Sequence, residues 1–545
     1  YCGFPAWPTT VLGFEIDVMY GLIMLFLLGI SLWFTFMGGQ IAVMVTDFIQ
    51  GMFVNAVFVI LGIYMLFFLF DWDVIVSAAI QYSPQDASLL NPMKTSGTDN
   101  FNLTYFLIAA FVSFYAFMAW QGSQGYFSSA RSPHDARMGR VIGQLRNITQ
   151  TLPLALLPVC AFAFLHHPDF AQSAQGAHAI LDGIESDQIR SQVTVTVASA
   201  QFLPPGIMGL FAAVMLAAFI STHDTYLHSW GSIFVQDIVM PIRQSLIGDR
   251  VMDSDVHVRW LKYSIFGVCT FIFLFSLLFS QQQDILMFFA LTGTIYLGWA
   301  GSCIIGGLYW KRGTTKGAWS CTILGVVLAF SGWYLTYNWE ASQQMISGLF
   351  PGWWASWTQS WPALLGDKCP ITAQVLFFWT IVTTIMTYVV VSLLANEEFD
   401  MDQLLHRGEY SVEGEGEAKT AAVAEKKWTD IFKMGPEFSQ GDKILFIGSY
   451  AYIFLFFAVF MIGTVYMLST DITDPSWGEF WWWFCVVILL MTAVITAWVS
   501  VGGIKNLGEL YEMLSNIRRD EHDDGTEVGH RSLADLHMEE KKAGE

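Results

Sequence analysis

Eleven apolar stretches, each long enough to cross a lipid bilayer, constrain what this chain can fold into. A helix rises about 1.5 Å per residue, so about 20 apolar residues span a hydrocarbon core of roughly 30 Å. The stretches lie at about 18–37, 44–70, 104–127, 148–166, 206–237, 259–281, 285–309, 316–337, 371–395, 444–468 and 481–503. Hydrophobic residues make up 54% of the chain, charged residues 13%, and the mean hydropathy is +0.48. These features predict an all-α, polytopic membrane protein with about eleven transmembrane helices.

The basic residues divide the connecting loops into two classes. All 26 Lys and Arg residues except Lys94, Arg190 and Lys368 lie in the loops after the third, fifth, seventh and ninth stretches or beyond the eleventh. Short cytoplasmic loops are enriched in Lys and Arg. We therefore expect those loops and the C-terminus to be cytoplasmic, in a multi-pass protein of the cell membrane. The net charge of −20 argues against a nucleic-acid partner.

The stretch 212–238 carries polar groups in the middle of a membrane span. Ala218, Ser221 and Thr222 are spaced i, i+3 and i+4, which places them on one helical face. A carbonyl and two hydroxyls there offer the oxygen ligands that an alkali cation needs. The alternative is that the hydroxyls bond to the carbonyl one turn earlier or pack against a neighbouring helix. Asp224 follows at once, and a carboxylate at this depth needs a cation, a donor or a proton.

Two further polar segments interrupt apolar stretches. Asp47 lies about one turn into its span, where a carboxylate can attract a cation. The alternative is that Asp47 is a residue near a helix N-terminus, where the helix dipole favours a negative charge. Trp120, Gln121 and Gln124 lie at the end of the third stretch. Neutral hydrogen-bonding groups beside aromatic faces suit the binding of a small polar solute. The alternative is that these residues form a helix end that reaches the polar interface of the membrane.

Three segments carry a resemblance to a known family. GGQIAVMVTDFIQ (38–50), MLAAFISTHDTYLHSWGSIFVQDI (215–238) and GLYWKRGTTKGAW (307–319) look like signature stretches of the sodium/solute symporter family. Its members include sodium-coupled sugar, proline, pantothenate and iodide carriers, and the order and spacing match over roughly residues 10–340. The resemblance implies the leucine-transporter fold, in which two inverted five-helix repeats hold ion and solute sites at mid-membrane.

The resemblance also assigns roles to particular residues. Ala218, Ser221 and Thr222 fall on the family's sodium-ligand positions, and the first core helix supplies the other half of that site. Asp47 matches a Thr-Asp carboxylate implicated there in sodium coupling or release. Asp224 resembles a Ser-Ser-Leu-Asp variant of the motif. These two residues are therefore candidates for cation coupling or for the cation pathway.

Two residues of this chain differ from those typical of the family's sugar carriers. Trp120 stands where sugar carriers have a binding Asn, and Thr149 stands where some have a Lys. The resemblance therefore supports sodium coupling more strongly than any particular solute.

The resemblance divides the chain into five parts. It begins at the family's fourth core helix, so we expect the first three core helices to precede residue 1. The expected parts are a transporter core (1–340), an outer loop with an accessory helix (341–396), a cytoplasmic polar loop (397–443), two accessory helices (444–503) and a cytoplasmic tail (504–545).

These features predict sodium-coupled secondary active symport of a small polar organic solute by alternating access. Sodium is the coupling ion, and we expect no other cofactor or metal and no catalytic residue. One alternative is a transporter-like solute sensor that signals through its tail, but the 42 residues after 503 are too short for a recognisable output domain. Another is a membrane enzyme that uses His223 and Asp224. The sequence has no HExxH or CxxC motif and no paired carboxylates on one face to support it.

Overall fold

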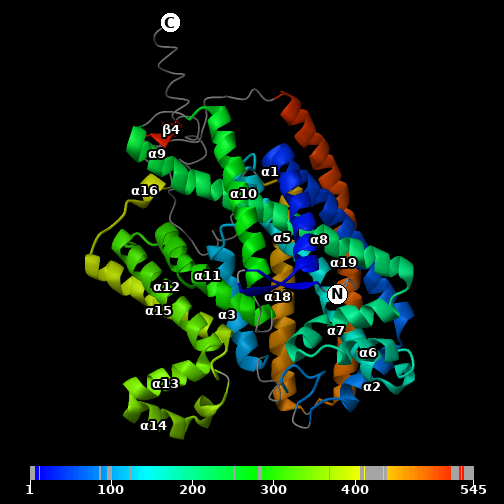
Figure 1. Cartoon of the computed structure of the whole chain (residues 1–545). Coiled ribbons are helices and arrows are strands. Elements are labelled where there is room, and N and C mark those ends of the chain that lie inside the picture. Colours follow the sequence, from blue (N-terminus) through cyan, green and yellow to red (C-terminus); the bar gives the residue numbers. More distant parts are fainter. Residues whose placement is uncertain are drawn as a thin grey trace.

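A bundle of long helices forms the protein in the computed structural model (Figure 1). Two short antiparallel hairpins accompany it, β1 (Pro8–Val11) with β2 (Phe14–Asp17) and β3 (Glu527–Val528) with β4 (Arg531–Ser532). The structure describes residues 7–516, together with 527–528 and 531–532, except 12, 85–86, 95–100, 123, 249–251, 280–284, 368, 405–409, 411–433, 435–437 and 471.

Nine helices in the described part are long and apolar enough to cross a membrane. They are α1 (Val18–Tyr64, extended by η1, Met65–Leu69), α5 (Pro133–His166), α8 (Pro205–Ile233, extended by η3, Phe234–Val239, and α9, Met240–Ile247), α10 (Ser254–Leu278), α11 (Ile285–Tyr309), α12 (Thr315–Tyr337), α15 (Ala373–Ala395), α18 (Gln440–Ser469) and α19 (Asp474–Asn516). Two of the eleven expected stretches are joined in α1, and a third forms α3 (Leu103–Ala119), which is short for a span at 17 residues. The predicted all-α, polytopic membrane protein is confirmed.

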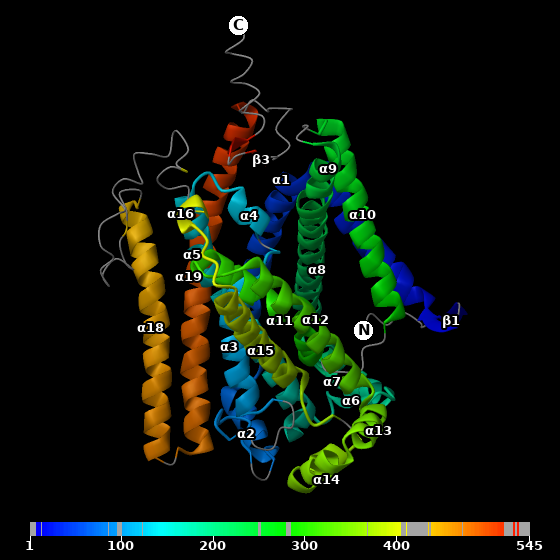
Figure 2. The ribbon, with the colours of Figure 1, turned by 90° about the vertical axis from the view of Figure 1, so that its left-hand side faces the viewer.

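The helix α1 contains a sharp break that accounts for this merger. A straight helix of its 47 residues would be about 70 Å long, more than twice the thickness of a bilayer core. Gly39 adopts φ 55° and ψ −146°, outside the helical region and accessible mainly to glycine. In Figure 2 the first part of α1 runs from β1 towards the end of the bundle where α9 lies. The break therefore separates two membrane-spanning legs, 18–38 and 40–64.

The shorter helices gather at the two ends of the bundle (Figures 1 and 2). One end holds α2 (Trp72–Gln81), α6 (Gln175–Asp182), α7 (Asp187–Phe202), α13 (Trp339–Leu349) and α14 (Pro351–Ser360). The turns η2 (Pro168–Phe170) and η4 (Pro362–Leu365) directly precede or follow members of this group in the chain. The other end holds α9, α16 (Met401–Leu404) and the end of α19. This grouping agrees with the two loop classes expected from the basic residues.

Local sequence sets where several helices begin. Ser132 precedes Pro133, and its Oγ accepts the N–H of Asp135 at 3.1 Å, a cap followed by proline at the first helical position of α5. Ser439 and Asp442 form a reciprocal capping box at the start of α18. Asn102 accepts the N–H of Tyr105 and caps α3. These caps satisfy backbone donors that the helices themselves leave unpaired.

Apolar packing holds α8 between the first leg of α1 and α10. Leu28, Leu227, Ile265 and Cys269 form a buried cluster across these three helices. A Cβ at Gly231 would lie 2.5 Å from the Ile265 side chain, so this glycine lets α10 approach α8 closely. The position of α8 relative to α1 is thereby fixed.

The third signature segment, 307–319, forms the tight turn between α11 and α12 and docks against α15. A Cβ at Gly306 would overlap the ring of Tyr388, and a Cβ at Gly317 would overlap Ser392 Oγ. The Thr314 N–H donates to Ser392 Oγ at 3.2 Å. Gly317 and the preceding Gly306 therefore allow close packing against α15.

Candidate functional site

Asp47 is the centre of a polar cluster between α1, α8 and the short helix α4 (Gln124–Ser128). Ser221 Oγ donates to Asp47 Oδ1 at 2.5 Å, and Thr225 Oγ1 donates to Oδ2 at 2.9 Å. Tyr126 donates its phenol proton to the same Oδ2 at 2.6 Å and lies 2.8 Å from Thr225 Oγ1. The carboxylate is thus surrounded by three neutral hydroxyls, and we call these four residues the Asp47 cluster.

The elements place these side chains by simple spacing. Asp47 lies two turns after the break at Gly39, in the second leg of α1. Ser221 and Thr225 are i and i+4 on α8, so both face the same neighbour. Tyr126 lies on α4. Three separate segments of the chain therefore meet at one carboxylate.

The charge of this cluster is unbalanced. Across the described residues, no Lys or Arg forms an ion pair with Asp47. A carboxylate in a membrane helix is costly, and it normally pairs with a cation or lines an ion pathway. The cluster presents five oxygen atoms, two from Asp47 and one from each hydroxyl residue. Such an all-oxygen set suits a small, hard cation such as sodium.

The three sodium ligands expected on α8 do not form one cluster here. Ser221 belongs to the Asp47 cluster, whereas Ala218 and Thr222 lie on an adjoining, exposed face of α8. Thr222 Oγ1 donates to the Ala218 carbonyl at 2.8 Å, which is one of the two arrangements that the alternative interpretation allowed. Ser221 instead bonds across to α1. The structure therefore gives the two hydroxyls different surroundings.

Asp224 is fully buried, with 0% of its surface exposed. Its Oδ1 accepts the backbone N–H of Thr225 at 2.7 Å, and its Oδ2 has no hydrogen-bond partner among the described residues. The neighbouring His223 has partners of its own, because its Nδ1 lies 2.8 Å from the Phe219 carbonyl and its ring stacks on Phe219. The His223 ring is therefore held by Phe219, whereas Asp224 keeps one carboxylate oxygen, Oδ2, without a hydrogen-bond partner among the described residues.

The expected span 104–127 is not one helix. The helix α3 ends at Ala119, Trp120 is extended (φ −77°, ψ 121°), and α4 begins at Gln124. Ser229 Oγ donates to the Gly122 carbonyl at 2.9 Å, which ties this interruption to α8. Non-helical backbone at membrane depth is tolerated where it is buried in protein or lines a cavity. Interrupted helices of this kind commonly form solute and ion sites in secondary transporters.

The expected solute residues lie at this interruption. The Trp120 ring meets the rings of Tyr226 and Tyr296 edge-on, at centroid distances of 6.0 and 6.5 Å. Gln121 is half-buried beside it. The backbone of Gln124 opens α4, and its side chain lies outside the described part of the structure. The interruption therefore places aromatic rings, a side-chain amide and backbone carbonyls together.

Sequence reasoning missed two members of the Asp47 cluster. The sequence alone assigns no role to Tyr126 or Thr225. Thr225 lies four residues after Ser221, a same-face spacing that could have found it. Tyr126 is 79 residues from Asp47 in sequence, so no local pattern connects the two.

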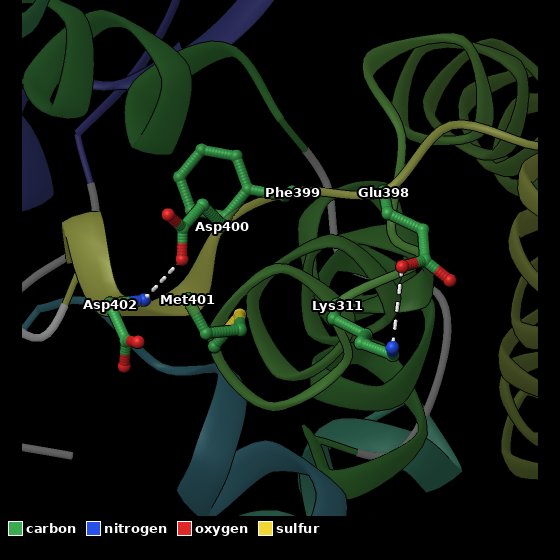
Figure 3. Close-up of a pocket in the computed structure, with 6 residues that line it drawn as sticks. All are labelled: Lys311, Glu398, Phe399, Asp400, Met401 and Asp402. Carbon is green, nitrogen blue, oxygen red and sulfur yellow. Dashed lines mark hydrogen bonds and ion pairs between the residues drawn. The ribbon is translucent and has the colours of Figure 1, made fainter.

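A hollow of about 430 Å³ near the α11–α12 turn is a different kind of site (Figure 3). Lys311 and Glu398 form an ion pair of 3.3 Å at its edge, and Arg312 approaches the same carboxylate at 3.2 Å. The hydrogen bond and charge of Lys311, and then those of Arg312, hold the pKa of Glu398 below its usual value. Because these side chains are about half exposed, the hollow is a charged surface feature rather than a solute site.

Comparison with known proteins agrees with this geometry. Residues 10–325, more than half of the chain, match the family model of the sodium:solute symporter family. Over 310 residues the chain is 25% identical to a sodium/pantothenate symporter of Haemophilus influenzae, covering 56% of each sequence. The chain thus spans about half the length of this curated relative. The match contains the Asp47 cluster and the helix interruption, and the chain belongs to the sodium:solute symporter family.

Proposed function

We propose that the protein carries a small polar organic solute across the cell membrane together with sodium, by alternating access. The observation that carries this proposal is the Asp47 cluster, a carboxylate held by three hydroxyls beside an interrupted helix. Membership of a symporter family supports sodium as the coupling ion. The relative's name specifies pantothenate, which we treat as one candidate solute among several.

The proposed cation path runs along α8. Ala218, Ser221 and Thr222 are the proposed sodium ligands, with Asp47 and Asp224 as the carboxylates that attract and release the ion. The hydroxyl of Ser221 bonds to Asp47, and the next residue, Thr222, lies on the exposed face of α8. Ser221 therefore lies between the Asp47 cluster and the exposed face that carries Ala218 and Thr222. A cation that moves between these faces would exchange partners at Ser221.

The proposed solute site is the interruption between α3 and α4. Trp120 offers an aromatic face, and Gln121 and Gln124 offer amides that can both donate and accept hydrogen bonds. Uncharged groups of this type suit a polar solute.

Tyr126 links the two sites in this proposal. It follows the interruption directly, yet its hydroxyl bonds to Asp47 at 2.6 Å. A cation at Asp47 would compete for the carboxylate oxygen that Tyr126 now occupies, and would weaken this contact between α4 and α1. Sodium binding would thus change the solute site, and by linkage the solute would change sodium affinity by the same factor.

The proposed orientation places the C-terminus and residues 397–443 in the cytoplasm. The charge distribution of the loops supports this orientation. A single cysteine introduced at position 420 should react with an impermeant maleimide only after the cells are opened. Reaction in intact cells would contradict the orientation.

Solute-stimulated tracer sodium uptake tests the proposed transport. The protein is reconstituted in liposomes and challenged with separate panels of small carboxylates, amino acids and sugars, pantothenate included. At least one solute should increase sodium entry, and its own uptake should require sodium rather than potassium. If a solute binds but neither species crosses, the protein is a sensor and the transport proposal is wrong.

A further inference from the structure

Two cysteine thiols meet in the membrane helices that form the α11–α12 hairpin. Cys303 Sγ and Cys321 Sγ lie 3.4 Å apart, one on each helix. Both thiols also point at the Ala318 carbonyl, at 3.7 and 3.2 Å. Neither residue belongs to the Asp47 cluster or to the helix interruption.

The packing around the pair keeps the two helices close. One turn away on each helix, a Cβ at Gly325 would lie 2.7 Å from the Trp299 side chain, so the backbones approach closely at that level. The Gly306 contact with Tyr388 fixes the other side of the pair. The thiols are therefore held in contact by the fold rather than by chance rotation of two exposed side chains.

We infer that Cys303 and Cys321 are a modification site. They form an oxidisable dithiol whose oxidation gives a disulfide that links α11 to α12. A disulfide has an S–S bond of about 2.05 Å, so the sulfurs must approach by about 1.4 Å. Side-chain rotation and a small helix shift can supply this movement. The bond would fix the surface against which α3 packs, because the Ser302 N–H on α11 donates to Tyr115 OH on α3 at 3.0 Å.

The exposure of the two thiols determines which of them reacts first with a peroxide. Cys303 is half-buried and Cys321 is fully buried, so the Cys303 thiolate attacks first. The peroxide O–O bond breaks, Cys303 becomes a sulfenic acid and one water leaves. The Cys321 thiolate then attacks the Cys303 sulfur, and the sulfenic oxygen leaves as a second water. Two thiols and one hydrogen peroxide thus give one disulfide and two waters.

Trypsin provides a direct test, because three exposed basic residues separate the cysteines. Cleavage after Lys311, Arg312 and Lys316 places Cys303 in peptide 263–311 and Cys321 in peptide 317–368. The intact protein is treated with hydrogen peroxide, its remaining thiols are alkylated, and it is then denatured, digested and analysed by mass spectrometry. The two peptides should be joined in the oxidised sample and separate after treatment with a thiol reductant.

Serine variants decide which sulfurs are joined. Peptide 263–311 also contains Cys269, whereas peptide 317–368 contains no cysteine besides Cys321. The linked pair should be lost in Cys303→Ser and Cys321→Ser and retained in the control Cys269→Ser. Separate peptides in the oxidised wild type would overturn the inference. Linkage that persists in Cys303→Ser would overturn it as well.

Discussion

Replacing Asp47 by asparagine removes the charge of the proposed cation site and nearly preserves the side chain's shape. In the structure this carboxylate accepts hydrogen bonds from Ser221, Thr225 and Tyr126. An amide keeps one acceptor oxygen and can donate to a hydroxyl oxygen, so the helices should remain packed. The variant therefore tests cation binding rather than folding.

The size of the effect follows from the charge and its surroundings. Two unit charges 4 Å apart attract by about 4 kcal/mol at an effective dielectric constant of about 20. Sodium must share the carboxylate with three donors, and each hydrogen bond to a charged group contributes about 1.5–3 kcal/mol. Part of the attraction is therefore offset, and we expect a net loss of about 2–3 kcal/mol. The sodium Kd should rise about 30- to 160-fold.

Thermal unfolding in a sodium titration measures this change without knowledge of the solute. Sodium replaces choline at constant ionic strength, and a ligand that binds only the folded state raises the Tm as its concentration passes the Kd. Asp73→Asn is the matched control, because Asp73 is an exposed acid in the first turn of α2. It should leave the sodium curve unchanged. If Asp47→Asn also leaves the curve unchanged, Asp47 is a structural carboxylate and the cation-site argument fails.

Three further predictions concern α8 and the α11–α12 turn. Ser221→Ala should raise the sodium concentration for half-maximal uptake about tenfold, equivalent to roughly 1.4 kcal/mol, and an unchanged value would leave Ser221 a packing residue. Gly306→Ala should destabilise the protein by about 1–3 kcal/mol in chemical unfolding, because its methyl overlaps a ring of α15; Gly307→Ala has open space and should be nearly neutral. The pKa of Glu398 is lowered mainly by Lys311, so the stability from this ion pair is present above the usual glutamate pKa and is lost as the pH falls through the lowered value. Glu398→Gln should therefore show a smaller fall in Tm between about pH 5 and 3.

The sequence predicts the membrane helices well because length and apolarity alone decide them. Each of the eleven stretches lies mainly in a helix, and the largest difference is the interruption inside the stretch 104–127. Gly39 turns the chain with a positive φ inside α1, and the gap between the predicted stretches 18–37 and 44–70 falls at this break. The interruption after Ala119 was not predicted, because Gln121 and Gln124 also fit a continuous helix whose end reaches the polar interface.

The candidate site was predicted only in part because its contacts are tertiary. Asp47, Ser221 and Thr222 stood out as polar residues in apolar spans, and the family resemblance supplied their expected roles. Which hydroxyl faces Asp47 depends on the rotation of α8, and packing of Leu227 and Ile265 sets that rotation. The sequence could not distinguish Ser221 from Thr222 for this reason.

Uptake against a gradient tests the coupling of solute to sodium most directly. With 100 mV, inside negative, one sodium ion supplies about 2.3 kcal/mol, and a tenfold sodium gradient adds about 1.4 kcal/mol. In proteoliposomes under both forces, labelled solute should accumulate inside well above its outside concentration, up to about 500-fold for one sodium per solute. The accumulated solute should leave when a sodium ionophore collapses the gradient. Solute that only equilibrates to equal concentrations, with or without sodium, would contradict the account.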